Sequence, residues 1–267
     1  MDIKITSVWC TTKNPTQSQF YLHTHNEYEI FCILSGNAQY SVEGNKYKLM
    51  PGDIMIMRKN EFHYLLLKSN EPYERIVVNF SVDAEMESND LLAPFICRKA
   101  GERNHYRPSS LQYNHMLYYL KKLCKANTMQ KKSCYLLPFL SELNEAFELD
   151  FNSQKPTKDK ATHIINYINS HLEEDISLTG VSEDFFISSN HINRIIKETS
   201  GTTFWEYVTV KRLSLAREQI KSGRKPIEAC FSSGFKDYAT FFRSYKKHFG
   251  VSPKADKSPI PLTEIQN

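Results

Sequence analysis

The first eighty residues contain short runs of β-branched and aromatic residues at nearly even spacing. The runs that predict strands lie at 28–34, 37–42, 46–49, 53–57, 64–67 and 75–80. They are separated by turn signals rich in Gly, Pro and Asn, at 35–37, 43–45, 51–52, 59–60 and 70–72. Short strands joined by tight turns are typical of an antiparallel barrel or a double-sheet roll. We predict such a fold for residues 1–110.

From residue 111 the hydrophobic period becomes helical, which predicts helices at 111–126 and 133–147. The first helix would have a stripe formed by Leu111, His115, Tyr118/Tyr119 and Lys122/Leu123. The second would have a stripe formed by Leu136, Phe139/Leu140, Leu143 and Phe147. Each amphipathic helix needs an apolar partner surface. That surface is either the barrel itself or a second copy of the chain, which would form a homodimer.

Residues 152–160, NSQKPTKDK, are polar, contain a proline and have no apolar period. Such a stretch is typical of a linker between domains. We therefore predict an N-terminal domain at 1–150 and a linker at 151–160. A second domain follows at 161–256.

Residues 227–253, IEACFSSGFKDYATFFRSYKKHFGVSP, predict two helices joined by a turn. Asp237 is a natural N-cap for the second helix. Phe241, Tyr245 and Phe249 recur at four-residue spacing and would bury one side of it. Gly250 would end it. Two short helices in this order form a helix-turn-helix unit, whose second helix enters the DNA groove.

A similar unit lies upstream. Ser188 can cap a helix that extends to about residue 199, with Ile192, Ile195 and Ile196 on its buried side. Its opposite side has Asn190, Asn193, Arg194 and Lys197. The residues Thr203-x-x-Glu206 form a capping box that opens a long connecting helix ending at 222–223.

Together the two units resemble the DNA-binding region of the AraC/XylS family of bacterial transcription regulators. The resemblance covers about residues 161–253, and the Gly-Phe, Phe-Phe-Arg and Lys-Lys-x-Phe-Gly-x-Ser-Pro elements make it specific. It implies that the connecting helix lets the two recognition helices enter successive major-groove segments, about 34 Å apart. It also implies an N-terminal domain that senses a small molecule, commonly a sugar or related metabolite.

The resemblance further implies which side chains meet DNA. In the first unit the base-contacting residues would be Asn190, Asn193 and Arg194, because Asn pairs well with adenine and Arg with guanine. Lys197 lies on the same face. In the second unit the groove-facing residues would be Tyr238, Ala239, Thr240, Phe242 and Arg243, followed by Lys246 and Lys247 at phosphates. Phe242 either touches a thymine methyl group or folds back on the helix pair.

Charge and cysteine content agree with this interpretation. The 267-residue chain has a net charge of only +4, but residues 189–257 contain fourteen Lys or Arg and six acidic residues. Such a local excess suits phosphate contact. The six cysteines are scattered without a Cys-x-x-Cys pair, and no run has the length of a signal peptide or a membrane span. These features predict a cytoplasmic protein.

The segment His23-Thr-His25-Asn-Glu-Tyr-Glu29, followed at a distance by Gly36, resembles the first cupin motif. His63, which follows Pro51-Gly52-Asp53, stands where the second motif has its histidine. Residues 23, 25 and 29 share one face if they lie on one strand. Three imidazoles and one carboxylate are competent ligands for Fe, Mn, Ni, Cu or Zn. Effector contact, a bound metal and structural hydrogen bonding all remain open for His23, His25, Glu29 and His63, with Tyr21, Phe31 and Tyr64 as candidate aromatic walls.

We therefore predict an α+β, two-domain protein. It would have a cupin-like β-barrel followed by two helices, and an all-α C-terminal domain with two helix-turn-helix units. The expected function is sequence-specific DNA binding under the control of a small-molecule effector, without enzymatic activity. Expected partners are promoter DNA, the effector and a second copy of the chain, with RNA polymerase contact compatible with this role. No cofactor is expected. The alternatives are a metal-dependent cupin enzyme with a helical appendage and a module for protein contact.

Overall fold

The computed structural model describes residues 3–15, 22–67, 69, 71–87, 90–148 and 160–256. Within these ranges, no helix combines the length and the hydrophobicity needed to cross a membrane. The chain divides into an N-terminal unit, Met1–Thr157, and a C-terminal unit, Lys158–Asn267. Of the predicted linker at 151–160, only Lys160 lies among the described residues, as the first residue of a helix.

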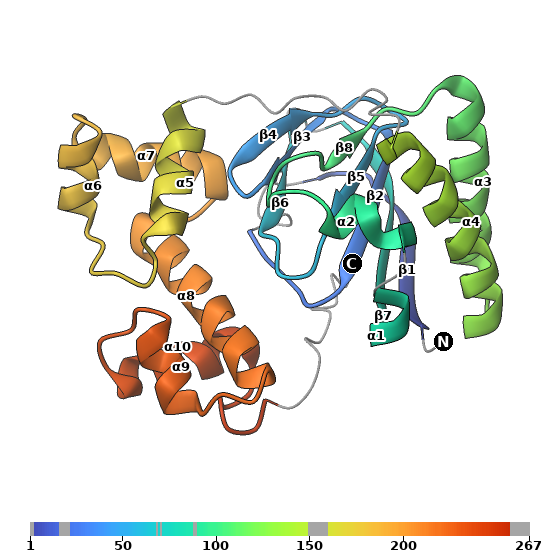
Figure 1. Cartoon of the computed structure of the whole chain (residues 1–267). Helices are drawn as coiled ribbons and strands as arrows, with labels where there is room; N and C mark the ends of the chain where they lie inside the picture. The colour runs from blue at the N-terminus through green and yellow to red at the C-terminus, as the bar shows by residue number, and fades with distance from the viewer. Residues whose placement is uncertain are drawn as a thin grey trace. The chain divides into compact units, whose positions relative to one another are not determined.

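The N-terminal unit is built from two antiparallel sheets (Figure 1). Its strands are β1 (Ile3–Thr12), β2 (Tyr28–Ser35), β3 (Ala38–Val42), β4 (Asn45–Lys48), β5 (Ile54–Met57), β6 (His63–Leu67), β7 (Tyr73–Val82) and β8 (His105–Tyr106). The larger sheet has the order β1-β7-β2-β5-β8, and the smaller has the order β4-β3-β6. The predicted double-sheet arrangement is confirmed.

The six predicted strands all occur, with ends within two residues of the expected positions. Two strands were not predicted. Strand β1 pairs with β7 in register from Ile3–Val82 to Thr12–Tyr73. Its outer half exposes Val8 and half-exposes Trp9, so its sequence lacks a clean alternation of apolar and polar residues. Strand β8 has only two residues, and its pairing with β5 depends on contacts far along the chain.

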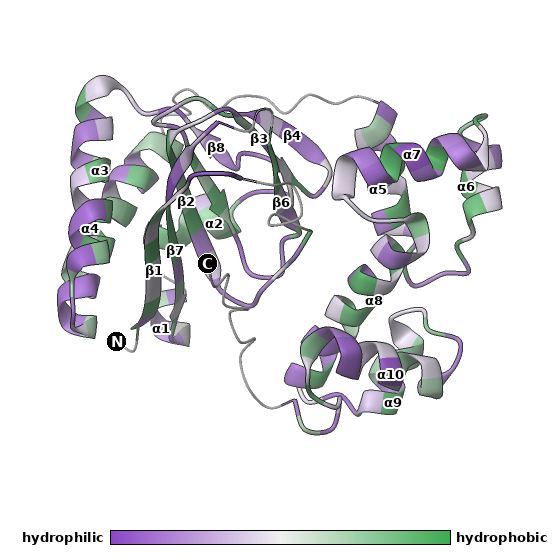
Figure 2. Ribbon diagram, turned by 180° about the vertical axis from the view of Figure 1, so that it is seen from behind, coloured by the Kyte–Doolittle hydropathy of each residue, from purple (hydrophilic) through white to green (hydrophobic). Residues whose placement is uncertain are grey.

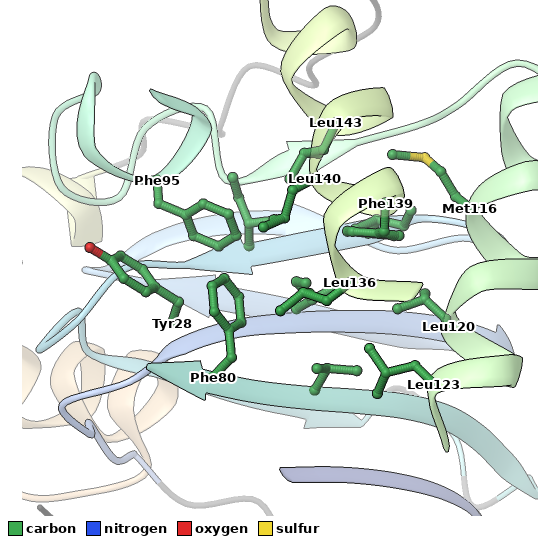
Figure 3. Close-up of a cluster of buried hydrophobic side chains, with 14 of the residues drawn as sticks. Tyr28, Phe80, Phe95, Met116, Leu120, Leu123, Leu136, Phe139, Leu140 and Leu143 are labelled. Atoms are coloured by element: carbon green, nitrogen blue, oxygen red, sulfur yellow. The ribbon is translucent and has the colours of Figure 1, made fainter. Parts of the chain in front are cut away.

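Each face of the larger sheet has its own hydrophobic core. On one face, alternate residues of β2 such as Phe31 and Ile33 pack with Tyr40 and Leu65 from the smaller sheet. On the opposite face, Tyr28 and Phe80 pack beneath helices (Figure 3). Because successive strand residues point to opposite faces, one strand supplies both cores.

The helices over this second face are α3 (Ser110–Lys125) and α4 (Met129–Glu148). They follow the short segments α1 (Ala84–Glu87), η2 (Asp90–Leu92) and α2 (Ala93–Ile96). Hydrophobic and hydrophilic residues alternate along α3 and α4 (Figure 2). Both helices contribute residues such as Met116 and Leu140 to this core, so they pack on the barrel.

The predicted stripe of α4 is confirmed, since Leu136, Phe139, Leu140, Leu143 and Phe147 are all buried. The predicted stripe of α3 is only partly correct, because it shares Leu123 and Tyr119 with the observed inner face. Its buried residues are Met116, Leu120 and Leu123, whereas Leu111 and Tyr118 are exposed. Both sets fit a helical period, and only the position of the sheet selects between them.

The C-terminal unit contains α5 (Lys160–Ser170), α6 (Leu178–Asp184), α7 (Ser189–Ser200), α8 (Phe204–Lys221), α9 (Pro226–Ser232) and α10 (Tyr238–Phe249). Helices α6 and α7 form one helix-turn-helix pair, and α9 and α10 form the other. Both pairs contact α8, which runs between them (Figure 1). The predicted two helix-turn-helix units are confirmed.

The predicted ends of these helices are also confirmed. Ser188 caps α7 and Asp237 caps α10, each accepting a hydrogen bond from a backbone amide of the first turn. Thr203 and Glu206 form the reciprocal capping box of α8. Gly250 ends α10 in the left-handed conformation. Local signals therefore determine where each helix begins and ends.

Gly234 lies in the turn of the second unit and has a φ of +89°. A Cβ atom here would lie 2.2 Å from the backbone oxygen of Leu172 and 2.7 Å from Nε of Arg212. The guanidinium of Arg212 donates to that same oxygen through Nε, at 2.7 Å. The glycine therefore allows the turn to approach a buried arginine that joins α8 to the segment after α5.

We expect Gly234→Ala to lower the free energy of unfolding of the C-terminal unit by about 2–3 kcal/mol, from backbone strain and overpacking. Gly223→Ala is the matched control, because Gly223 has a φ of +98° but no atom within 4 Å of the added Cβ. Urea titrations followed by Trp205 fluorescence in a Trp9→Phe background measure both variants. Equal losses in the two would show that the close approach contributes nothing.

Candidate nucleic-acid interface and effector site

Helix α7 has a buried side and a polar side, as its sequence predicts. Ile192, Ile195 and Ile196 are buried. On the other side Asn190, Arg194 and Lys197 are exposed. Arg194 approaches Glu198 at 4.0 Å, and both side chains are about two-thirds exposed. An ion pair this exposed is weak, so an incoming anion such as a phosphate can compete with Glu198 for Arg194.

Asn193 differs from its neighbours. It is half-buried, and its Oδ1 accepts a hydrogen bond from the backbone amide of Phe204 at 3.1 Å. This bond holds the first turn of α8 against α7. In this structure its side-chain oxygen therefore joins two helices, in addition to any role at DNA.

Helix α10 exposes Ala239, Thr240, Arg243, Lys246 and Lys247. Arg243 donates from Nη2 to Oγ1 of Thr240 at 3.2 Å, which helps to fix the guanidinium along the helix face. The amide of Thr240 bonds to the capping carboxylate of Asp237, and this bond lowers the pKa of Asp237 below its ordinary value. The cap at Asp237 thus fixes the N-terminus of α10, where its polar face begins.

The two aromatic residues of this face differ in exposure. Tyr238 is half-buried and packs against Phe241 of the domain core. Phe242 is 36% exposed, and its ring lies 6.3 Å from that of Tyr238. Phe242 therefore leans toward its own helix while keeping an accessible edge.

Several basic residues of the C-terminal unit are not available to a ligand. Lys211, Arg212 and Arg217 are each less than a tenth exposed. Arg217 pairs with Asp256, with 2.6 Å between Nε and Oδ2. The number of basic residues in the sequence therefore overstates the number of accessible cations. The exposed cations on α7 and α10 are Arg194, Lys197, Arg243, Lys246 and Lys247.

In the N-terminal unit, His23, His25, Glu29 and His63 come together. One ligand atom from each of the four lies within 4.8 Å of those of the others. We call these four residues the histidine cluster. Its donor set suits a transition metal or a hydroxyl-rich organic ligand.

The expectation that residues 23, 25 and 29 share one strand is only partly correct. Strand β2 begins at Tyr28, so only Glu29 lies on it. His23 instead forms an isolated bridge with His63, with hydrogen bonds of 3.1 and 3.0 Å in both directions. The loop before β2 thus reaches the cluster by pairing with the first residue of β6.

Glu29 is central in the cluster. Its Oε2 lies 2.8 Å from Nε2 of His25 and 3.3 Å from Nε2 of His63. Its Oε1 accepts a hydrogen bond from the hydroxyl of Tyr40 at 3.1 Å. Tyr40 was missed at the sequence level, although it shares a strand face with the buried Val42.

The electrostatics of the cluster are strongly coupled. Burial by itself would raise the pKa of the Glu29 carboxyl, but the adjacent histidines hold it well below its ordinary value. Burial would likewise lower the pKa of His63, but the Glu29 carboxylate raises it. The cluster therefore favours a carboxylate with positive charge beside it.

The candidate aromatic walls are in different places. Phe31 shares the face of Glu29 on β2 and packs against Tyr40, with 4.8 Å between the ring centroids. Tyr64 follows His63 on β6 and so points to the opposite face of that strand, where it is buried. Tyr21 lies outside the described residues.

Comparisons with known proteins show which families and proteins the chain resembles. Residues 7–126 match the family model described as an AraC-like ligand binding domain, and residues 181–257 match a helix-turn-helix domain. The HTH-type transcriptional activator RhaS of Mannheimia succiniciproducens is 21% identical, covering 89% of each chain. The probable transcriptional regulator LumQ of Photobacterium leiognathi is 25% identical over 95% of this chain and 97% of its own. Among solved structures, ToxT from Vibrio cholerae is 19% identical with a TM-score of 0.39, covering 95% of this chain and 97% of its own.

Proposed function

Because the chain belongs to the AraC family of transcriptional regulators, with a ligand-binding domain followed by a helix-turn-helix domain, we propose that α7 and α10 contact the bases of promoter DNA. We propose in addition that the histidine cluster contacts the small-molecule effector.

The observation that supports the DNA contact is the pair of exposed polar faces on α7 and α10, on helices whose opposite faces are buried. The intervening helix α8 has 18 residues and is therefore about 27 Å long. That length is comparable with the roughly 34 Å between successive major-groove segments on one face of B-DNA. One rigid spacer thus suits two adjacent contacts.

The exposed side chains divide by chemistry. Asn190, Arg194 and Arg243 have the planar donor groups that pair with base edges. Lys197, Lys246 and Lys247 are flexible point charges and suit phosphates. Ala239, Thr240 and the accessible edge of Phe242 would meet the floor of the groove beside Arg243. Asn193 and Tyr238 would support this surface from half-buried positions.

The effector in this proposal is a small, oxygen-rich metabolite such as a sugar. Imidazole, carboxylate and phenol groups can each hydrogen-bond to its hydroxyls. Its binding would change DNA occupancy only if its affinity differs between two states of the protein. We propose no catalytic step, and the relatives reported above are named as regulators.

A homodimer is part of the proposal. The side of α3 that faces away from the barrel core exposes Leu111 and Tyr118, which a second copy could cover. A regulator bound beside a promoter is also within reach of RNA polymerase, so contact with that enzyme belongs to the same proposal, as does a cytoplasmic location beside the chromosome.

The decisive variant is Arg243→Ala, tested on an operator selected by the wild-type chain from a random DNA library. We expect specific binding to weaken about 5- to 150-fold, corresponding to about 1–3 kcal/mol for a bidentate base contact. Relaxed preference for one base pair in the footprint should accompany the loss.

Lys246→Ala is the matched control, because it removes a cation from the same exposed face. We expect it to weaken binding to all sequences alike and to reduce the salt slope by about one. An Arg243→Ala variant that keeps wild-type affinity and base preference would contradict the assignment of that residue.

A further inference from the structure

The histidine cluster has a hydrogen-bonding pattern that its own protons do not satisfy well. Nδ1 of His25 lies 3.1 Å from the carbonyl oxygen of Glu27. Nδ1 of His63 lies 2.7 Å from the carbonyl oxygen of Glu61. A carbonyl oxygen can only accept, so each ring must have its proton on Nδ1.

The consequence appears on the other side of each ring. If both imidazoles are neutral, their Nε2 atoms are bare acceptors that face the Glu29 carboxylate, which is also an acceptor. If only one is protonated, the bare Nε2 of the other still faces the carboxylate. If both are protonated, one carboxylate must balance two buried positive charges. Nε2 of His63 is fully buried and makes no well-directed hydrogen bond, despite lying 3.3 Å from Oε2 of Glu29.

A cation between these atoms removes both difficulties. We propose that His23, His25, Glu29 and His63 bind one divalent transition-metal ion of the kind that prefers imidazole, such as Zn²⁺, Fe²⁺, Ni²⁺ or Cu²⁺. The proposal deepens the effector site proposed above, because oxygen atoms of the effector would then meet the metal.

The distances fit a single ion. With metal–ligand bonds of about 2.0–2.2 Å, two ligand atoms of one ion lie roughly 2.8 Å apart at a right angle and up to about 4.4 Å apart on opposite sides. Oε2 of Glu29 is 2.8 and 3.3 Å from the two Nε2 atoms, and the largest separation within the set is 4.8 Å. The two ligand atoms that lie farthest apart would need to approach each other by well under 1 Å for all four to coordinate one ion.

The surrounding contacts are those that metal ligands usually have. A ligating histidine commonly donates its other N–H to a backbone carbonyl, and a ligating carboxylate is commonly hydrogen-bonded on its free oxygen. His25 and His63 have the first contact, and Glu29 has the second through Tyr40. His23 is only half-buried and so leaves a route from solvent.

Metal binding is best tested on untagged full-length protein, because a histidine tag would itself bind metal. After treatment with EDTA, we expect the wild type to bind one Zn²⁺ per chain in competition with a chromophoric chelator. Co²⁺ in place of Zn²⁺ should give a visible absorption band. We expect Glu29→Gln and His23→Ala each to weaken binding at least 10-fold.

His115→Ala is the control, since His115 lies on α3 in the same unit, is exposed and pairs with Glu142 at 3.2 Å. It should bind Zn²⁺ as the wild type does. If Glu29→Gln fails to fold, His23→Ala still decides the matter, because His23 is outside the buried Glu29–His63 pair. Absence of stoichiometric binding in the wild type, or equal binding in His23→Ala, would overturn the metal site. DNA binding is measured separately, so failure of either proposal is distinguishable from failure of the other.

Discussion

Asp256→Ala is expected to lower the free energy of unfolding of the C-terminal unit by about 3–5 kcal/mol, as for other buried pairs that lose one partner. Oδ1 and Oδ2 of Asp256 accept from the guanidinium of Arg217 at 3.2 and 2.6 Å. Oδ2 also accepts from the hydroxyl of Tyr245 at 2.8 Å. Both members of the ion pair are almost fully buried. Removal of the carboxylate leaves a buried guanidinium without its counter-charge.

The loss extends to a second cation. Burial and the charge of Arg217 lower the pKa of Lys221, whereas Asp256 raises it. One carboxylate therefore compensates two neighbouring positive charges on α8 and, through Tyr245, ties α10 to that helix. Urea titration followed by Trp205 fluorescence in a Trp9→Phe background isolates this unit, because the chain has only two tryptophans.

Asp175→Ala is the matched control. Asp175 pairs with Lys236 at 2.6 Å, but both side chains are about three-quarters exposed. Little change is expected, because water screens such pairs. The double variant Arg217→Met with Asp256→Leu should be closer to the wild type than Asp256→Ala, since it removes both buried charges. Equal midpoints for the two single aspartate variants would refute the role assigned to the buried pair.

Much of the fold could be predicted because its signals are local. The caps at Ser188 and Asp237 act within one helical turn, and a turn such as Pro51-Gly52 determines where strands stop. The hydrophobic period alone was enough to predict which face of α4 is buried. The grouping of the histidine cluster was also predicted, because its residues stand where the two cupin motifs place theirs.

What could not be predicted depends on partners far along the chain. Strand β1 forms by pairing with β7, some seventy residues away. The inner stripe of α3 depends on how the helix lies on the sheet, which no local period specifies. The buried state of Arg217 depends on Asp256, a residue beyond the last helix. A count of basic residues therefore included cations that are buried and overstated how many can meet a ligand.

Glu61 accepts several buried hydrogen bonds through its carboxylate and was not among the predicted residues. Both of its oxygens accept from the guanidinium of Arg98 at 2.7 Å. They also accept from the amides of Arg58 and Gly101 and from Nδ2 of Asn104. Neither side chain of the Glu61–Arg98 pair is exposed. Glu61 thus fixes the turn that presents its own carbonyl oxygen to His63.

We expect Glu61→Gln to lower the free energy of unfolding of the N-terminal unit by about 3–5 kcal/mol. The amide keeps the shape of the side chain, but it turns one acceptor into a donor that faces other donors. Trp9 lies on β1 and reports on this unit in a Trp205→Phe background. Glu142→Gln is the control, because Glu142 pairs only loosely with the exposed His115, and a loss of no more than about 1 kcal/mol is expected.

The same pair predicts how stability depends on pH. Burial would raise the pKa of Glu61, but the charge and hydrogen bonds of Arg98 hold it below its ordinary value. A carboxyl with a depressed pKa contributes stability above its unfolded pKa of about 4.3, and this contribution disappears as pH falls through the lower folded value. The wild type should therefore lose stability more steeply than Glu61→Gln below about pH 4.3. Parallel urea midpoints for the two proteins across that range would show that Glu61 is not ionised in the folded unit, and the buried ion pair would then not be the source of its stability.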